Sequence, residues 1–206
     1  LPNPIVLSAE SGLLSIRGAD LPYIQISNMD ELSEAFLWCR DSDEAKQFES
    51  IGIDSLSEIA EVVLSAEKKK ASDPRQAYGA TQDKIADLVR AFRDLPGHHV
   101  WMIAKMERIQ DDQGRLMYNP MMPGNKLGQM IPYWFDLLLP LRCEQVADGS
   151  IQRMLQTDTD GVWNAKDGSG KLDMWEPLTL APLLGRYYHE HSDTNKCLPR
   201  LDRRKR

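Results

Sequence analysis

The stretch Ile51-Gly52-Ile53-Asp54-Ser55-Leu56-Ser57-Glu58 decides how this chain folds. It belongs to an apolar run that predicts a strand over residues 48–54, and the strand ends in the carboxylate of Asp54. A helix is expected directly afterwards, because apolar residues from Leu56 to Leu64 recur at helical spacing. A strand that ends in a carboxylate and leads into a helix is typical of the functional edge of an α/β sheet.

Strands and helices alternate around this stretch. Further strands are expected at residues 5–7, 23–26 and 99–104. Helices are expected at residues 29–41, 56–64 and 78–95, with a charged loop at residues 67–75. This order predicts an α/β fold of three layers with a mostly parallel central sheet. In such a sheet, functional groups gather at the carboxyl ends of the strands.

The second half of the chain has weaker patterns. Residues 106–125 are rich in Met, Gly, Pro and Asp, which predicts a long loop or hairpin and a candidate functional segment. A short helix is expected at residues 126–133, and strands are expected at residues 135–143 and 152–156. We assign residues 1–176 to the α/β core and residues 177–206 to a loosely ordered basic tail.

Charge is distributed unevenly along the chain. The 206 residues include 25 Lys+Arg and 31 Asp+Glu, a net charge of -6, which excludes a surface built throughout to bind polyanions. Residues 200–206 carry a net charge of +4, and residues 1–199 therefore carry -10. Any contact with a nucleic acid must come from local patches.

The cysteines and the hydropathy indicate a compartment. Cys39, Cys143 and Cys197 are far apart and odd in number, so they do not suggest a disulfide framework. No apolar run approaches the roughly 18 residues of a membrane span. We therefore expect a cytoplasmic protein with no membrane partner.

Polar side chains follow three of the predicted strands. Glu10 follows the first, Asp54 ends the third, and Lys105 with Glu107 follows the fourth. Because the carboxyl ends of parallel strands share one edge, these groups are expected to meet there. The cluster suits a metal–phosphate or general-base site. The alternative is that they are ordinary helix caps and loop charges.

These segments, in this order, resemble the RecA-like ATPases. The Asp54 stretch resembles a Walker B strand, and residues 5–12 (IVLSAESG) resemble the preceding strand, whose terminal Glu aligns the attacking water. The closer similarity is to the phage-encoded nucleotide-binding AAA proteins, a RecA-like group linked to single-strand annealing and recombination. It covers residues 4–176 and includes Tyr78-Gly79, Met106-Glu107-Arg108, Met122-Pro123-Gly124-Asn125-Lys126-Leu127, Pro132-Tyr133-Trp134-Phe135-Asp136 and Ala165-Lys166-Asp167-Gly168-Ser169-Gly170-Lys171.

The resemblance implies a RecA-like P-loop NTPase core that hydrolyses ATP to ADP and phosphate with Mg²⁺. Glu10 would orient water, and Asp54 with Ser55 would hold Mg²⁺, directly or through water. Lys105 and Glu107 would form a sensor pair. ATP would bind between subunits of a ring or filament, and Lys166 or Lys171 would reach the neighbouring subunit's nucleotide.

Single-stranded DNA is the expected partner in a phage-infected bacterial cytoplasm. Mobile basic side chains neutralise phosphates without reading sequence. The candidates are Lys68, Lys69, Lys70, Arg75, Arg108, Arg115 and Lys126, with the basic residues of the tail. Tyr118 and the methionines at 117, 121 and 122 are candidates for insertion between bases, with ordinary packing as the alternative.

One element of the resemblance is missing from the 206 residues. No segment matches the phosphate-binding pattern G-x-x-x-x-G-K-[ST]. The resemblance places that loop before residue 5, so we expect a first βα unit of about 30–40 residues to be missing from this sequence. The alternative is that the chain has dispensed with it. Two other functions then stay open: a DNA-binding or scaffold module without ATPase activity, and a motor or helicase-loader ATPase.

Overall fold

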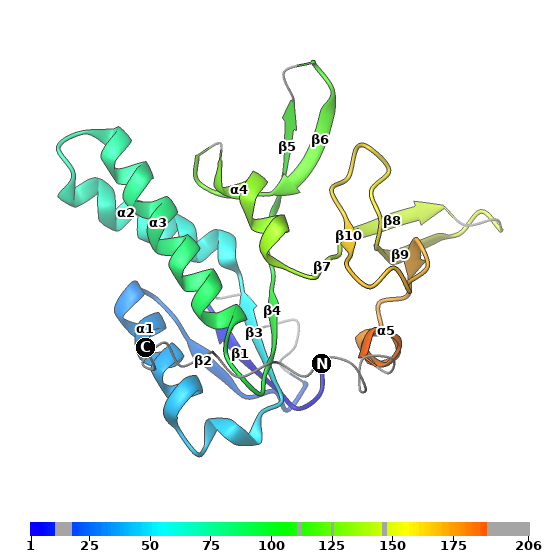
Figure 1. The fold of residues 1–206 in the computed structure, drawn as a ribbon, viewed down its shortest axis with the longest axis horizontal. Coiled ribbons are helices and arrows are strands. Elements are labelled where there is room, and N and C mark those ends of the chain that lie inside the picture. The colour runs from blue at the N-terminus through cyan, green and yellow to red at the C-terminus, as the bar shows by residue number, and fades with distance from the viewer. Residues whose placement is uncertain (11–17, 111–112, 125, 146–147, 189–206) are drawn as a thin grey trace, which may run out of the picture.

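A fully parallel four-stranded sheet forms the centre of the fold (Figure 1). The computed structural model describes residues 1–10, 18–110, 113–124, 126–145 and 148–188. The strands lie in the order β2-β1-β3-β4 and span Pro4–Ser8 (β1), Tyr23–Gln25 (β2), Ser50–Asp54 (β3) and His99–Met102 (β4). The predicted α/β class and mostly parallel sheet are thereby confirmed.

Three long helices connect these strands. They are α1 (Met29–Asp41), α2 (Leu56–Lys70) and α3 (Pro74–Arg93), and a 3₁₀ turn at Ala45–Gln47 precedes β3. Side-chain caps fix their starts, since Asn28, Ser55 and Asp73 each accept a backbone N–H of the first turn. Helix α2 continues to Lys70, and α3 starts at Pro74, a residue suited to a first turn. The expected charged loop at residues 67–75 is therefore mostly helical.

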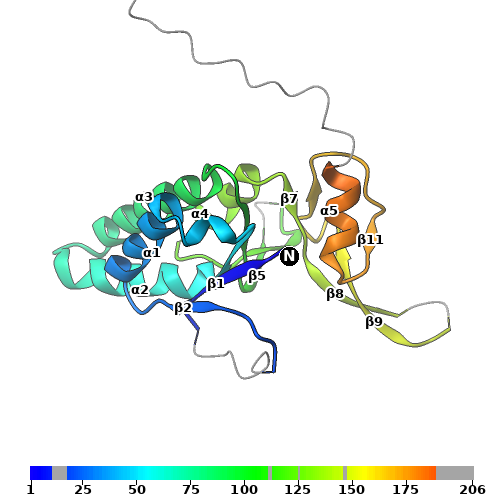
Figure 2. The same cartoon turned by 90° about the horizontal axis from the view of Figure 1, so that it is seen from below.

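All three helices cover the same face of the sheet (Figure 2). Their apolar side chains form one core with Ile5, Leu7, Ile51 and Ile53. The opposite face carries the alternate residues, including Val6 and Gly52. Both crossovers, β2–α1–β3 and β3–α2–α3–β4, advance in the same direction across the sheet, and right-handed connections then place their helices on one side. The expected third layer is thus absent from the described part of the chain.

The second half of the described chain is built from short antiparallel pieces. A hairpin of β5 (Met106–Gln110) and β6 (Leu116–Pro120) leads to α4 (Leu127–Met130) and a 3₁₀ turn at Ile131–Trp134. The remaining elements are β7 (Leu137–Leu138), β8 (Leu141–Gln145), β9 (Ile151–Gln156), β10 (Lys166–Asp167), β11 (Trp175–Glu176) and α5 (Leu180–Tyr188).

Two details of this half differ from the prediction. The expected strand at residues 135–143 is interrupted at Leu139 and Pro140, because proline has no N–H for a sheet. Helix α5 forms within the segment expected to be loosely ordered, since Leu183 and Leu184 are buried and Arg186 pairs with Glu176. Residues 189–206 of the expected tail lie outside the described residues.

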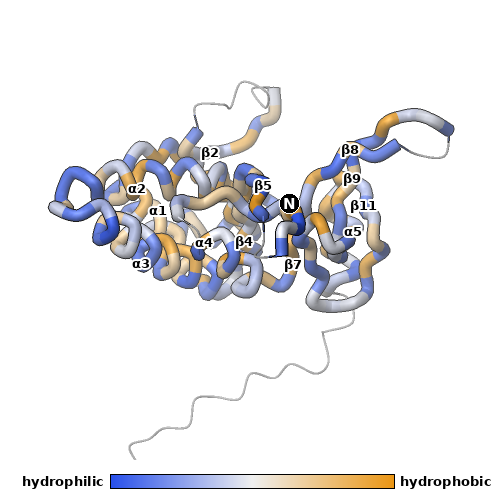
Figure 3. Tube along the Cα trace, turned by 90° about the horizontal axis from the view of Figure 1, so that it is seen from above, coloured by the Kyte–Doolittle hydropathy of each residue, from blue (hydrophilic) through white to orange (hydrophobic). Residues whose placement is uncertain are grey.

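Hydropathy along the trace separates the core from the projecting parts (Figure 3). Hydrophilic residues gather at the turn between α2 and α3, which includes the Lys68–Lys70 end of α2. In the part of the chain that the structure describes, no helix has both the length and the apolar character needed to cross a membrane.

Candidate functional site at the carboxyl edge of the sheet

The carboxyl ends of β1, β3 and β4 bring together the charged residues predicted to meet there. Ser8 of β1 lies opposite Asp54 of β3, so Glu10 emerges beside Asp54. The backbone N–H of Ala9 donates to the Asp54 carbonyl at 2.6 Å and fixes this junction. The Asp54–Ser55 peptide bond is cis. Of the four side chains predicted to share one edge, the structure brings Glu10, Asp54 and Lys105 together.

Side-chain contacts join these residues into one cluster. Ser55 Oγ donates to Glu10 Oε1 at 2.6 Å and also accepts the Glu58 N–H at 3.2 Å as the cap of α2. Lys105 Nζ lies 3.1 Å from Glu10 Oε1 and 2.9 Å from Glu58 Oε2. Ser55 is therefore the cap of α2, as one of its two predicted roles requires, and it is also a partner of Glu10.

The two carboxylates have opposite electrostatic surroundings. The hydrogen bond from Ser55, followed by that from Lys105, lowers the pKa of Glu10. Burial, followed by the negative charge of Glu10, raises the pKa of Asp54, and Lys105 only partly offsets this. Within the described residues, no side chain donates a hydrogen bond to the Asp54 carboxylate. Asp54 is thus an incompletely compensated charge next to a stabilised one.

Ser57 attaches this cluster to the β5–β6 hairpin. Its hydroxyl is buried, accepts the Lys105 N–H at 2.9 Å and donates to the Met121 carbonyl at 2.8 Å. The Met121 N–H in turn donates to the Lys105 carbonyl at 2.7 Å. One hydroxyl on α2 therefore holds both ends of the hairpin.

Sequence reasoning missed two members of the site, Ser57 and Glu58. For Glu58 a signal existed, because Ser55-x-x-Glu58 has the spacing of a capping box. The Glu58 carboxylate, however, accepts a hydrogen bond from Lys105. For Ser57 we find no signal, since its partners are 48 and 64 residues away in sequence.

Glu107, the proposed partner of Lys105 in a sensor pair, is placed elsewhere. It lies on β5 opposite Asn119, and its carboxylate faces Gly128 of α4. With Asn119, Gly124 and Gly128 it lines a separate cavity of about 550 Å³. The structure does not bring Glu107 into the Glu10–Lys105 cluster, because the chain leaves the central sheet after β4 and Glu107 belongs to the β5–β6 hairpin.

Lys166 and Lys171 belong to a compact loop in this structure. Lys166 Nζ donates to the Phe135 carbonyl at 2.7 Å. The Asp167 carboxylate accepts backbone N–H groups from Ser169, Lys171 and Leu172. To reach a neighbouring subunit's phosphate, Lys166 would have to leave its carbonyl partner.

The candidate DNA-binding residues are all exposed: Lys68, Lys69, Lys70, Arg75, Arg108, Arg115 and Lys126. Lys68 Nζ lies 5.3 Å from the ring centre of Tyr78, and a Cβ on Gly124 would lie 3.5 Å from Tyr78 Cδ1. The end of α2 and the loop next to Lys126 are thereby neighbours. Lys70 is engaged by Glu67 at 3.2 Å.

Two of the four proposed base-inserting side chains are engaged in packing. Met122 is buried in the main core. Tyr118 stacks on Trp163, with 4.2 Å between ring centres. For these two residues the packing alternative is correct.

A second charged cluster surrounds Arg142 on β8. Its guanidinium lies over Trp163 and Trp175, at 4.3 and 5.4 Å from the ring centres. It also donates to Gln156 at 2.6 Å and lies 3.2 Å from Asp160. The sequence analysis did not detect this cluster, whose members come from four separate segments.

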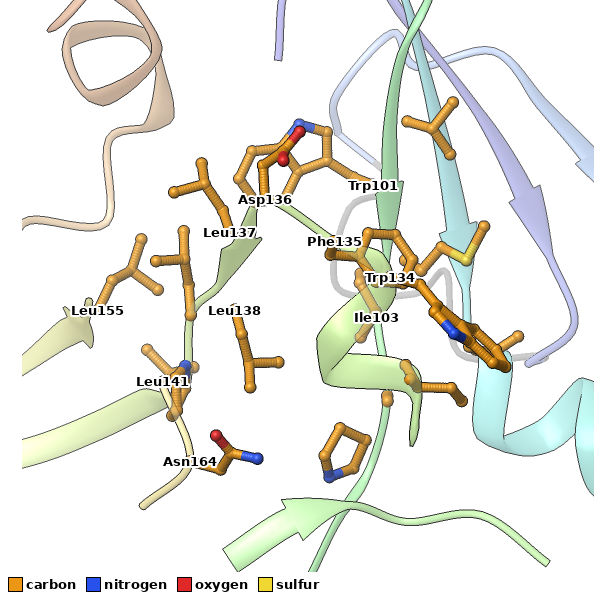
Figure 4. A pocket seen from close by; sticks show the side chains of 18 of the residues that line it. Trp101, Ile103, Trp134, Phe135, Asp136, Leu137, Leu138, Leu141, Leu155 and Asn164 are labelled. Atoms are coloured by element: carbon orange, nitrogen blue, oxygen red, sulfur yellow. The ribbon is translucent and has the colours of Figure 1, made fainter. Parts of the chain in front are cut away.

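An apolar cavity of about 650 Å³ runs beside β4 (Figure 4). One wall is formed by residues 98–105 and another by residues 134–141. Figure 4 shows Trp101 and Ile103 on the first wall and Leu137 and Leu138 on the second. The cavity follows β4 from its start to the carboxyl edge, where Lys105 lies.

A comparison with models of protein families shows to which family this chain belongs. The model described as an AAA domain matches residues 1–169, about four fifths of the sequence. The chain belongs to the AAA domain family. Membership indicates an AAA-type P-loop ATPase that binds a nucleotide, and the parallel sheet agrees with a P-loop NTPase-like domain. A search of the curated proteins finds none that matches the chain.

Proposed function

We propose that this AAA domain protein is a Mg²⁺-dependent ATPase that acts on single-stranded DNA in phage recombination or annealing. The observation that carries the ATPase part is the junction of β1 and β3, where Glu10 and Asp54 emerge side by side at the carboxyl edge. In open α/β sheets ligands bind outside this edge. Self-association into a ring or filament belongs to the same proposal.

Asp54 fits the role of a Mg²⁺ ligand. Its oxygens are the hard ligands that Mg²⁺ prefers, and burial beside Glu10 raises its pKa, so a cation would relieve the unfavourable charge. When bound, Mg²⁺ would neutralise charge on the phosphates. Ser55 Oγ is occupied by Glu10 and the start of α2, which favours Asp54 as the protein ligand.

Glu10 fits the role of orienting the attacking water. Its pKa is lowered, so it is ionised and able to accept hydrogen bonds at neutral pH. Ser55 and Lys105 both contact Oε1, which leaves Oε2 to accept a hydrogen bond from water. Lys105 holds the carboxylate in place and is itself held by Glu58.

The test of the ATPase function is the rate at which the protein hydrolyses ATP. Asp54→Ala should lower kcat by about 10²–10³-fold, the usual loss when a preorganised electrostatic group is removed from a phosphoryl-transfer or acyl-transfer site. Asp43→Ala is the control. It removes a highly exposed carboxylate that precedes β3 in the chain, and it should leave turnover unchanged. Circular dichroism checks that both variants fold. Equal turnover of Asp54→Ala and wild type would remove Asp54 from the mechanism.

The DNA part of the proposal is supported by where the exposed basic residues lie. Figure 1 shows the α2–α3 turn and the β5–β6 hairpin projecting from the same side of the molecule. Tyr78 of α3 lies close to Gly124 in the loop that follows the hairpin, since a Cβ on Gly124 would be 3.5 Å from Tyr78 Cδ1. A strand of DNA along this side would meet Lys68, Lys126 and Arg108 in turn.

Filter binding with single-stranded DNA tests this part. Each lost phosphate contact should reduce the slope of log K against log salt by about 0.7. Arg108→Ala and Lys126→Ala should each do so, whereas Lys46→Ala, at an exposed lysine of the 3₁₀ turn before β3, should not. Binding that is independent of ATP, with no turnover, would favour a DNA-binding module without ATPase activity, a reading compatible with the lack of a G-x-x-x-x-G-K-[ST] segment in these residues.

A further inference from the structure

Within the residues that the structure describes, the outer edge of β8 has no neighbouring strand. In the sheet order β11-β9-β8, strand β8 comes last, and Figure 3 shows the β8–β9 hairpin extending away from the rest of the chain. The edge of β6 in the other hairpin is different, because Tyr118 donates to the Val162 carbonyl at 2.8 Å and accepts the Asn164 N–H at 3.2 Å. In the described part of the chain, no backbone group covers β8 in this way.

The pairing of β8 with β9 determines which backbone groups point to this outer edge. The Gln156 N–H donates to the Pro140 carbonyl at 3.0 Å, so these two residues form a hydrogen-bonded pair. Hydrogen-bonded and non-hydrogen-bonded pairs alternate along an antiparallel ladder, so Arg142 and Glu144 bond to β9. The N–H and C=O groups of the alternate residues point away from β9. These free-edge residues are Leu141, Cys143 and Gln145.

The outer edge of β8 lacks the residues that usually protect an edge strand. Exposed edges commonly carry lysine or proline, which discourage pairing with another strand. None of the free-edge residues is a lysine or a proline. Leu141 is 57% exposed, and Cys143 and Gln145 are also exposed. This edge is therefore open to a further strand.

The sequence of β8 is complementary to itself when a second copy runs antiparallel to it. If Cys143 lies opposite Cys143 of the second copy, then Arg142 lies opposite Glu144 and Leu141 lies opposite Gln145. The Arg142 and Glu144 side chains share one face of β8, where they are 2.5 Å apart within one chain. Across the contact they would form non-hydrogen-bonded pairs, in which side chains approach most closely. Opposite charges in such positions stabilise a strand pair.

The outer edge of β9 does not have this complementarity. An antiparallel pairing of two copies centred on Arg153, the middle residue of that edge, would place two guanidinium groups opposite each other. Like charges directly opposite each other destabilise a strand pair. In addition, Leu155 and Gln156 of β9 are already paired with β11. The charge pattern therefore favours β8 as the pairing strand.

We propose that two copies of this chain associate through antiparallel pairing of their β8 strands, with Cys143 at the two-fold axis. The β11-β9-β8 sheets of the two copies would then form one continuous sheet. Both copies use the same surface, so the contact closes after two copies and differs from the head-to-tail contact of a ring or filament. It does not depend on the proposed ATPase or DNA-binding function.

The size of the contact sets its expected strength. Strand β8 has five residues, so the paired edges bury less surface than a stable protein–protein interface does. The backbone hydrogen bonds of the free-edge residues and the two Arg142–Glu144 pairs would hold it together. We therefore expect a dimer that dissociates on dilution.

Sedimentation equilibrium at increasing protein concentration tests the association. The wild type should show a monomer–dimer equilibrium. Cys143→Lys should raise its Kd by at least about fivefold, because two ammonium groups would face each other at the axis. Cys143→Ser is the matched control and should leave the Kd nearly unchanged. Cys143 is exposed, so both variants should fold, which circular dichroism checks.

Two results of this measurement would overturn the proposal. One is a wild type that remains monomeric up to its highest soluble concentration. The other is a dimer that Cys143→Lys weakens no more than Cys143→Ser does, because that dimer would form through another surface.

Cross-linking with a short bifunctional thiol reagent tests the register. Facing residues of a hydrogen-bonded pair have Cα atoms about 5.5 Å apart, so the reagent should join the two Cys143 side chains. The experiment uses Cys197→Ser protein, in which the other remaining thiol, Cys39, is buried. This protein should form a cross-linked dimer, and the same protein with Cys143→Ser should not. Absence of a cross-linked dimer from the Cys197→Ser protein would overturn the register.

Amide hydrogen exchange identifies the strand that pairs. At protein concentrations where the dimer dominates, the N–H groups of the free-edge residues should exchange at least about fivefold more slowly than in the monomer. The N–H groups of Arg142 and Glu144 should change little, because they are already bonded to β9. Slowing at Arg153 without slowing at the free-edge residues would place the contact on β9 and overturn the proposal.

Discussion

The Arg142 cluster and the cluster around Glu10 and Asp54 differ in how completely their charges are matched. Arg142 is held by Gln156 and Asp160 and lies over the rings of Trp163 and Trp175, and its side chain is only 16% exposed. Asp54 has a raised pKa and no side-chain donor among the described residues. A satisfied cluster contributes stability, whereas an unsatisfied carboxylate at a sheet edge costs stability and is retained where a ligand can use it.

Arg142→Ala should have the largest effect on stability and therefore tests this difference most directly. It should destabilise the protein by about 3 kcal/mol, because it leaves Asp160 and Glu144 without their cation and removes the stacking on Trp163. Urea unfolding measures the change. Arg153→Ala, at an exposed position of the same hairpin, should stay within about 0.5 kcal/mol of wild type. Similar losses for both would show that the cluster is not a stabilising centre.

Neutralising the two carboxylates of the site should change stability in opposite directions. Asp54→Asn should stabilise the protein at pH 7 by about 1 kcal/mol, as removal of a functional but unfavourable charge commonly does. Glu10→Gln should destabilise it by about 1 kcal/mol, because the charged acceptor of Ser55 and Lys105 is lost. Shifts of the same sign would contradict the assigned electrostatics.

The pH dependence of these two variants sharpens the contrast. The folded pKa of Asp54 is raised, so its unfavourable charge is present above that value, and the advantage of Asp54→Asn should vanish below the ordinary aspartate pKa of roughly 4. The folded pKa of Glu10 is lowered, so its stabilisation is present above its unfolded pKa and is lost as pH falls through the folded one. Thermal unfolding of wild type and both variants between about pH 3 and pH 7, a range that includes the ordinary carboxyl pKa values, measures the pH range over which each carboxylate changes the stability.

Lys105→Met should have the smallest effect on stability. The ammonium is 46% exposed, so its two ion pairs should contribute only about 0.5 kcal/mol, and salt should reduce that further. The pKa of Glu10 should nevertheless rise, since Lys105 is one of the groups that lower it. Carbon-13 NMR of Glu10 follows the titration, and an unmoved pKa would leave Ser55 as its main determinant.

The sequence predicted the central sheet and the strand-end cluster because both depend on local patterns. Strand–helix alternation implies parallel strands, and Glu10, Asp54 and Lys105 directly follow apolar runs. The position of Glu107 was not predictable in the same way, because the direction of its side chain depends on the register of β5 against β6. Nor was the Arg142 cluster, which combines residues 142, 156, 160, 163 and 175 through tertiary packing.

That the described residues show helices on one face of the sheet, and not the expected third layer, has a different cause. Alternation predicts that helices cover a sheet, but the direction in which successive crossovers advance decides which face each helix takes. With β1 between β2 and β3, and β4 beyond β3, α1 to α3 all lie on one side. A single sequence does not fix that strand order.

The hydroxyl of Ser57 fixes the base of the β5–β6 hairpin, so a rotation at the base would move the other end much further. Both arms are fastened at Lys105 and Met121 to one point on α2. Each arm has five residues, so the tip lies about 17 Å from this pivot. A rotation of Lys105 by a few degrees at the sheet edge would therefore sweep the tip through more than an ångström. Small movements near Glu10 and Asp54 would be magnified where the exposed Arg115 stands.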